Sequence, residues 1–290
     1  MLQGVLIYGL INSVIMVLVA MGFNLTFGIS GVANFAYGAL YIMAGFLCWS
    51  LLSSLGLPYL LAAALSVAAT ALLAGLLFRF VLLRVRGLVI SEVIATFGVG
   101  LAILELFRYL GFIGFEYTLP VWLDFYLEMG DIVIDGQRLM ILAMGAGLTL
   151  FLWAFTRFTR TGRAFRGIAQ DERTALTLGI NTDLVAAFAV AFGAGYAALA
   201  ALVILPLGTI AVGEGYDVLV NALAVCIVGG LGSTLGVIVA AFLIGFAQTF
   251  TATYGGTHWM MIVSLAALLI ILVIKPSGLF GKQKELEERI

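Results

Sequence analysis

The residues that could do chemistry are concentrated in one stretch, residues 157–183, with the sequence RFTRTGRAFRGIAQDERTALTLGINTD. It carries five arginines, and apolar residues such as Phe165 and Ile168 recur among them at helical spacing. This pattern predicts a short amphipathic helix that starts at Thr161-Gly162 and stops at Gly179. Such a helix could be a contact element that faces water. A solvated connector between two spans would carry the same charges. Both interpretations of the stretch stay open at this point.

Catalytic chemistry finds little support elsewhere in the chain. The one histidine is His258, and the two cysteines, Cys48 and Cys226, lie in apolar runs and are interpreted as small buried hydrophobes. These residues cannot form a metal-ligand cluster. A phosphate-binding loop needs Gly-Lys followed by Ser or Thr, but Gly281-Lys282 is followed by a glutamine. We therefore expect that this chain is not an enzyme and that it holds no metal and no cofactor. Any ATP-driven step must then be carried out by a partner.

The elements that must position the arginine-rich stretch are membrane helices. The chain has 290 residues, of which 63% are hydrophobic and only 10% are charged, and its mean hydropathy is +1.20. Soluble domains are closer to half apolar and one quarter charged. The first charged residue is Arg79, so the sequence before it is long enough for several spans. The composition predicts an all-α polytopic membrane protein with about 8–10 transmembrane helices.

Apolar runs of membrane length divide the chain into spans. One apolar run, 218–228, is not counted as a span, because it is too short to cross a membrane alone. Residues 1–281 are expected to form a single transmembrane domain that includes the loop 157–182, and residues 282–290 a short soluble tail. The expected spans are residues 4–27, 38–54, 58–80, 90–113, 138–157, 183–205, 237–253 and 258–274.

The distribution of basic residues predicts the orientation. Twelve of the fourteen lysines and arginines lie in the loop 79–86, in the stretch 157–173 and in the tail from Lys275. The positive-inside rule assigns these regions to the cytoplasm and the acidic, aromatic loop 114–137 to the outside. The N-terminus is then expected outside and the C-terminus inside, with an odd number of crossings.

Two glycine-rich stretches interrupt the apolar runs in opposite halves of the chain, residues 27–41 and 228–236. Broken or re-entrant backbone is tolerated inside a membrane only where it is buried in protein or lines a cavity. Paired interruptions of this kind indicate a substrate path between inverted repeats. Small residues such as Gly232 and Gly236 serve close helix packing as well, so both explanations are retained.

Ionisable residues inside the spans are scarce. Glu105 is the only one expected to lie deep, and Arg108, three residues on, can pair with it near the outer end of its helix. Proton- or ion-coupled carriers depend on intramembrane charges, and channels often carry charged rings. The scarcity therefore argues against both classes.

Four patches of this sequence are similar to one known family. The chain resembles the LivH-type permease subunit of bacterial branched-chain amino acid ABC importers over nearly its whole length. The patches are ANFAYGALYIMAGF (33–46), TGRAFRGIAQDERTALTLGINTD (161–183), VGGLGSTLGVIVAAFLIGFAQ (228–248) and LVIKPSGLFG (272–281).

The resemblance implies that residues 161–180 form a coupling loop that docks into a cleft of a separate ATPase. Two departures from the family pattern stand out: Tyr37 replaces a common histidine, and Gly167 replaces a usual alanine, which could loosen the coupling helix. The coupling residues implied are Arg163, Arg166, Asp171 and Glu172. The residues implied to flank the translocation path are Asn34, Phe35, Tyr37, Gly229, Gly230, Gly232 and Ser233.

The resemblance also implies partners. These are a second, LivM-like permease subunit (or a second copy of this chain), two ATPases that hold ATP and Mg²⁺, and a periplasmic binding protein. The setting would be the lipid bilayer of the bacterial inner membrane, with no nucleic acid involved. The cargo would be a branched-chain amino acid. Alternatives are urea, short amides, aromatic acids or another small solute on the same architecture, and, less favoured, an ion-gradient-driven carrier or a membrane scaffold.

Overall fold

The computed structural model describes residues 2–31, 33–112, 114, 117–129 and 132–281, and these are mostly helical. The described residues contain eight helices that are long and apolar enough to cross a membrane, which confirms the prediction of an all-α polytopic membrane protein. The first four are α1 (Leu2–Ser30), α2 (Tyr37–Leu55), α3 (Tyr59–Leu77, continued by η1, Phe78–Leu82, and α4, Leu83–Val85) and α5 (Val89–Tyr109). The other four are α6 (Gly136–Phe158), α9 (Thr182–Ile204, continued by η2, Leu205–Leu207), α11 (Thr234–Tyr254) and α12 (Met260–Ile274, preceded by η3, Thr257–Trp259).

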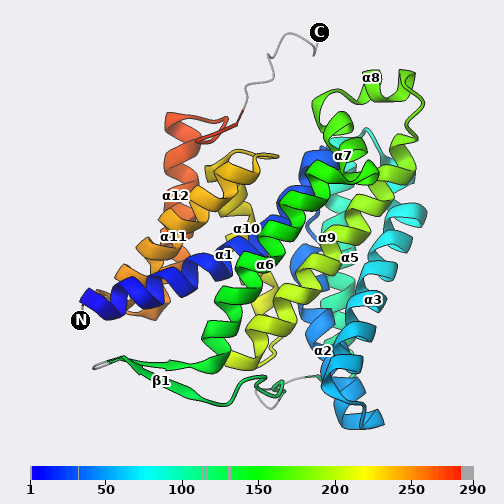
Figure 1. Ribbon diagram of the computed structural model, residues 1–290. Helices are drawn as coiled ribbons and strands as arrows, with labels where there is room; N and C mark the ends of the chain where they lie inside the picture. The colour runs from blue at the N-terminus through cyan, green and yellow to red at the C-terminus, as the bar shows by residue number, and fades with distance from the viewer. Residues whose placement is uncertain (1, 32, 113, 115–116, 130–131, 282–290) are drawn as a thin grey trace.

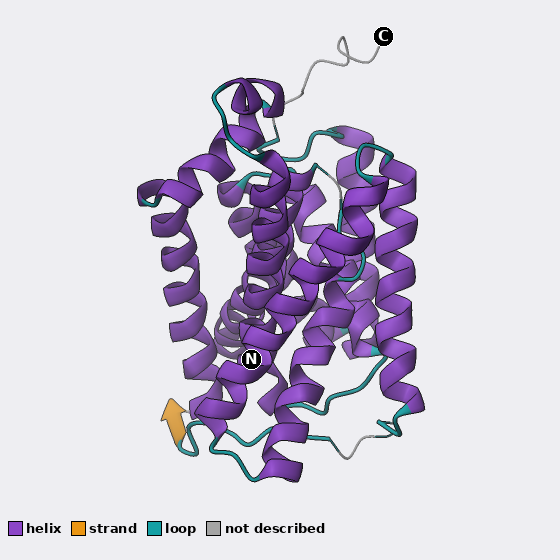
Figure 2. Cartoon of the chain, turned by 90° about the vertical axis from the view of Figure 1, so that its right-hand side faces the viewer, coloured by secondary structure: helices purple, strands orange, loops and turns teal. Residues whose placement is uncertain are grey.

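The bundle has two distinct ends (Figure 1). One end carries an antiparallel hairpin of β1 (Tyr126–Met129) and β2 (Ile132–Asp135), and we call it the hairpin end. The other carries two short helices, α7 (Arg160–Gln170) and α8 (Glu172–Thr177), and we call it the α7 end. Figure 2 shows most of the long helices running between these two ends. Helix α1 begins at the hairpin end and α12 finishes at the α7 end, as expected for an odd number of crossings (Figure 1). The predicted tail, 282–290, lies outside the described residues.

Helix α1 crosses the bundle obliquely and packs closely against two other helices through small residues. A methyl group on Gly193 of α9 would overlap the Thr26 hydroxyl of α1, and one on Gly245 of α11 would lie 2.6 Å from Cα of Ser13. In lipid, where apolar side chains gain little from burial against each other, such close backbone approach is a main source of helix association. These contacts make α1 the centre of the bundle.

A break in the chain separates α1 from α2. Tyr37, the first residue of α2, lies against Gly22, where an added methyl group would be 2.6 Å from the tyrosine hydroxyl. Gly22 in turn lies against Gly193, which is halfway along α9. Helix α2 therefore begins in the interior of the bundle, close to the middle of α9.

A second break, at residues 208–213, follows α9 and leads into α10 (Glu214–Gly229). Gly215, in the first turn of α10, is so close to Gly38 that a methyl group on Gly38 would overlap its carbonyl oxygen. The two helices thus begin side by side within the bundle. Since α1 and α9 run in opposite directions (Figure 1), the units α1–α2 and α9–α10 are inverted relative to each other.

The predicted glycine break at 228–236 is present as a turn between α10 and α11, but it lies at the α7 end and not in the interior of the bundle. Its glycines serve close packing and left-handed backbone: Gly230 and Gly232 have φ values of 100° and 82°. The turn also receives the C-terminal segment, whose Leu279 and Phe280 amides donate hydrogen bonds of 2.8 and 3.0 Å to the Val228 and Gly229 carbonyls. The third and fourth sequence patches therefore pack against each other.

We predict that Gly38→Ala lowers the free energy of unfolding by about 3 kcal/mol, because the new methyl group must displace the backbone of α10. Thermal melting of the detergent-purified protein, followed by size-exclusion recovery, measures the effect. Gly213→Ala is the matched control, because an added methyl group there meets no atom within 4 Å. Equal melting temperatures for the two variants would show that α2 and α10 do not begin in contact.

Candidate functional site: the surface of α7 and α8 and the interior breaks

Helix α7 is fixed to the bundle by one cap and one apolar face. The Thr159 hydroxyl accepts a 2.9 Å hydrogen bond from the Gly162 amide and so caps the helix start. Gly162 lies directly against the end of α6, where a methyl group would overlap the Phe155 carbonyl oxygen. The buried side chains of Phe165 and Ile168 complete the contact with the bundle. They pack with Ile29, Ala175 and Ala189.

The stretch expected to form one helix forms two. Asp171 adopts an extended backbone, and its carboxylate accepts hydrogen bonds from the Arg173 amide at 2.9 Å and from the Thr174 hydroxyl, so that a new helix, α8, starts there. The hydrogen bond from Thr174 is the main reason that the pKa of Asp171 lies below its usual value. Gly179 ends α8 in a left-handed conformation, as predicted. The arginine-rich stretch is therefore a knob of two short helices.

The outer surface of this knob is basic. Arg163 and Arg166 are both exposed, whereas Phe165 and Ile168 of the same helix are buried. Arg166 donates a 3.4 Å hydrogen bond to the Arg157 carbonyl, which turns its side chain back toward the end of α6. Arg163 makes no ion pair within the described part of the chain. The amphipathic pattern of the sequence thus corresponds to a bound apolar face and a free cationic face.

Arg86 joins the two basic loops of the α7 end. Its guanidinium contacts Glu172 at 2.5 Å and also pairs with Asp183. Glu172, one of the predicted coupling residues, therefore has an ion-pair partner within its own chain. The sequence offered no signal for this pairing, because the partners are more than 80 residues apart. Both acidic side chains are about half exposed, so each pair stabilises the protein by about 1 kcal/mol or less.

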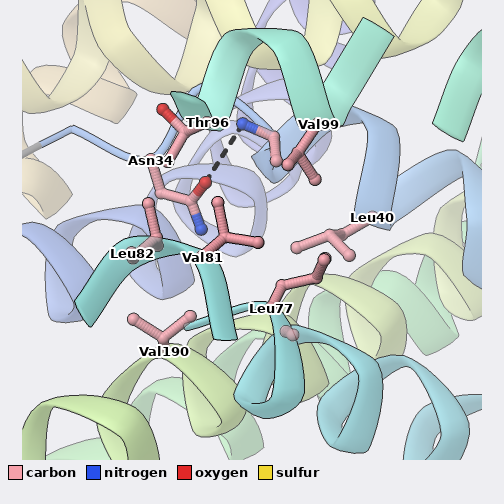
Figure 3. A pocket seen from close by; sticks show the side chains of 10 residues that line it. Asn34, Leu40, Leu77, Val81, Leu82, Thr96, Val99 and Val190 are labelled. Atoms are coloured by element: carbon pink, nitrogen blue, oxygen red, sulfur yellow. Dashed lines mark hydrogen bonds between the residues drawn. The ribbon is translucent and has the colours of Figure 1, made fainter. Parts of the chain in front are cut away.

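Asn34 and Phe35 shape the first break. The Asn34 side-chain oxygen accepts a 3.0 Å hydrogen bond from the Ala36 amide, and the Phe35 amide donates to the Thr96 hydroxyl at 3.2 Å. Figure 3 shows Asn34 and Thr96 surrounded by apolar side chains of α2, η1, α5 and α9, among them Val99. The two bonds satisfy backbone groups that would otherwise be unpaired inside the membrane. Tyr37 is 1% exposed and its ring meets Phe23 edge-on at 5.6 Å.

The predicted path glycines lie at the α7 end. Ser233 caps α11 by accepting a 3.1 Å hydrogen bond from the Gly236 amide, and Gly229 packs against Gly236. Gly232 donates a 2.8 Å hydrogen bond to the Asn24 side chain of α1. Gly232, Asn24 and Arg166 also line a single cavity of about 200 Å³. One residue from the predicted coupling set and one from the predicted path set therefore share a cavity, whereas Asn34, Phe35 and Tyr37 lie elsewhere.

Sequence inspection missed two carboxylates at the second break. Glu214 and Asp217, which follow the expected span 183–205 and precede the run 218–228, lie in the first turn of α10, and both line a cavity of about 400 Å³. Glu105, expected to be the deep carboxylate, is paired with Arg108 at 2.6 Å as predicted and is about half exposed at the end of α5. Among the described residues no group of three metal-ligating side chains is present.

Comparison with known proteins identifies the family. Residues 5–272 match the family model described as the branched-chain amino acid transport system permease component. The chain belongs to this family. The permease is 26% identical to the branched-chain amino acid permease protein BraD of Pseudomonas aeruginosa and 27% identical to LivH of Escherichia coli K12, in each case over 91% of both chains.

Two further relatives extend the comparison. The permease is 26% identical to LivM of Escherichia coli K12, over 92% of this chain and 68% of LivM, so its relatives include both named permease types. Among solved structures, PsaBC from Streptococcus pneumoniae in complex with Fab matches with a TM-score of 0.54 at 13% identity, over 94% of this chain and 92% of that chain, which indicates a shared fold. The relatives are transport permease proteins, in agreement with the prediction that this chain is a transport subunit and not an enzyme.

We predict that Gly167→Ala stabilises the permease by about 0.5–1 kcal/mol, because alanine loses less backbone entropy in a helix. There is room for the methyl group, since its nearest neighbour would be Ile180 Cδ1 at 3.8 Å. Gly162→Ala in the same helix is the matched contrast and should lower the melting temperature, because Gly162 touches the end of α6. Melting curves of both variants in detergent test the pair, and a lower melting temperature for Gly167→Ala would contradict the assigned packing of α7.

Proposed function

We propose that this permease is a transmembrane subunit of a binding-protein-dependent ABC importer for branched-chain amino acids. The observation that carries the proposal is the family match over residues 5–272, together with relatives along nearly the whole chain that are named high-affinity branched-chain amino acid transport permeases. ATP is hydrolysed in separate ATPase subunits, which also hold the Mg²⁺. A periplasmic binding protein delivers the amino acid, and a LivM-like subunit completes the membrane assembly.

In this proposal the α7 end faces the cytoplasm of a bacterial inner membrane. The concentration of arginines on α7, α8 and the loop around Arg86 supports this orientation by the positive-inside rule. The N-terminus and the β-hairpin are then periplasmic, and the C-terminus is cytoplasmic. The binding protein would meet the hairpin end and the ATPases the α7 end.

The knob formed by α7 and α8 is the coupling element of the proposed transporter. Arg163, Arg166 and Asp171 contact the ATPase, and Glu172 holds the knob in place through Arg86. The buried face of Phe165 and Ile168 supports this role, because a force on the exposed arginines passes directly to α1 and α9. Movement of α7 also changes the cavity that Arg166 shares with Gly232.

Transport follows alternating access between inward- and outward-open states. ATP binding to the partner subunits favours one state over the other and so shifts their populations. Asn34, Phe35, Tyr37 and the segment around Gly229, Gly230, Gly232 and Ser233 are proposed to flank the path, as hinges more than as surfaces that bind the cargo. Two observations support a hinge role: the Asn34 and Thr96 side chains accept hydrogen bonds from the Ala36 and Phe35 amides of the first break, and the glycine turn joins α10 to α11 at the α7 end.

We predict that Arg166→Glu reduces ATP-dependent uptake of labelled leucine by at least about tenfold, because a reversed charge at a docking interface weakens the complex and its coupling. The measurement is uptake into right-side-out vesicles that contain the full set of subunits, and inverted vesicles are the control. Arg108→Glu is the matched charge reversal at the hairpin end, outside the knob, and should leave most of the uptake intact. Unchanged uptake with Arg166→Glu in correctly assembled complexes would refute the coupling role.

A further inference from the structure

The largest of the cavities described above lies beside the second break. It has a volume of about 400 Å³ and is lined by α1, α2, the end of α9 and the start of α10. Residues Leu207, Gly208 and Thr209 are part of its lining, and the neighbouring Ile210 amide donates a 2.7 Å hydrogen bond to the Tyr117 carbonyl of the loop before the β-hairpin. The cavity therefore lies toward the hairpin end, opposite the knob.

One wall of this cavity is acidic and lacks a balancing cation. Glu214 and Asp217 are separated by one helical turn, so that their side chains lie on the same face of α10. Neither carboxylate forms an ion pair with a described residue, and no lysine or arginine lines the cavity. Two neighbouring carboxylates inside a membrane domain repel each other and lose hydration, and a bound cation relieves both costs.

A buried hydroxyl faces the same space. Tyr41 of α2 is only 2% exposed and lines the cavity together with Glu214. Its hydroxyl makes no hydrogen bond with any described residue. A buried polar group without a partner is costly unless a ligand or water supplies one. The hydroxyl-bearing Tyr41 and the two carboxylates thus line the same cavity from two different helices.

The remaining wall is apolar. Ile15, Met16 and Val19 of α1 and Leu205 of η2 line the cavity opposite the carboxylates. Asn221, two turns after Glu214, lies on the same side as the acids, and the Ser264 hydroxyl donates a 2.7 Å hydrogen bond to its side-chain oxygen. A pocket with a small polar group at one side and an apolar wall at the other suits a compact ligand that is itself amphipathic.

We propose that this cavity is a binding site of the permease for the ammonium group of its cargo, held between Glu214, Asp217 and the Tyr41 hydroxyl, with an aliphatic body against α1. The proposal rests on the transport function proposed above and adds a selection step within the membrane subunit: an amino acid or aliphatic amine is accepted, and a carboxylic acid without an ammonium group is rejected. Charge-assisted hydrogen bonds from an ammonium group to carboxylates provide the discrimination.

A purely structural role for the acids makes a different prediction. Negative side chains in the first turn of a helix stabilise it through the helix dipole. If Glu214 and Asp217 had only this role, their neutral variants would lower the melting temperature without changing ligand preference. Ligand preference is therefore the decisive property.

The test uses the intact transporter complex, purified without binding protein, and tritiated leucine in a scintillation proximity assay. The competitors are 3-methylbutylamine, which keeps the ammonium group, and 4-methylpentanoate, which keeps only the carboxylate. We expect the amine to compete and the acid not to. Glu214→Gln and Asp217→Asn should each weaken binding of leucine and amine by about tenfold, and Tyr41→Phe by less. Glu105→Gln, a carboxylate outside the cavity, is the control and should bind normally.

Equal competition by the acid, or normal binding in both Glu214→Gln and Asp217→Asn, would overturn the site. A fall in melting temperature that accompanies unchanged affinities would assign the acids to the helix dipole instead. Failure of the proposed function looks different: the amine would still bind in a Glu214-dependent way, but the complete transporter would take up no leucine. Leucine uptake without any binding to the purified complex would refute the site alone.

Discussion

The constraint on which this structure depends is that backbone polar groups inside a membrane must find partners within the protein. The chain breaks two helices there and then begins α2 and α10 side by side, with Gly38 against Gly215. This is possible because the breaks are enclosed by α1, α5 and α9 and because Asn34 and Thr96 hydrogen-bond to the free amides of the first break. Only glycine permits the approach, since any side chain at position 38 would displace the neighbouring backbone.

The two ends of the bundle are specialised in different ways. At the α7 end, charges are exposed, a knob of two short helices is anchored by Phe165 and Ile168, and the C-terminal segment packs on the 228–236 turn. Toward the hairpin end, the acids Glu214 and Asp217 are directed into a cavity. Helix α1 contacts both regions, because Ile29 packs on α7 and Ile15 lines the cavity. A displacement of the knob can therefore alter the interior through a single helix.

Much of the fold could be predicted from the sequence, because spans of apolar residues must be long enough to cross a bilayer. The amphipathic spacing around Phe165 likewise predicted a helix with a free basic face. The split at Asp171 was missed, because an aspartate within a helical pattern does not reveal that its carboxylate will cap a new helix. The second break was misplaced for a similar reason: the 228–236 stretch has more glycines than 208–213, yet it needs them for a tight turn. The sequence did not single out the acids at 214 and 217, because the break that carries them inward has no distinctive composition.

The central claim is that an exposed basic knob on one side acts on a bundle whose α2 and α10 begin inside the membrane. The most direct measurement is a cryo-electron microscopy structure of the intact assembly with its ATPase subunits bound. The account predicts that Arg163 and Arg166 lie in the contact with an ATPase, and that Gly38 and Gly215 touch at the depth of the bilayer. An ATPase that does not contact α7 or α8, or an α10 that begins at the membrane surface, would contradict it.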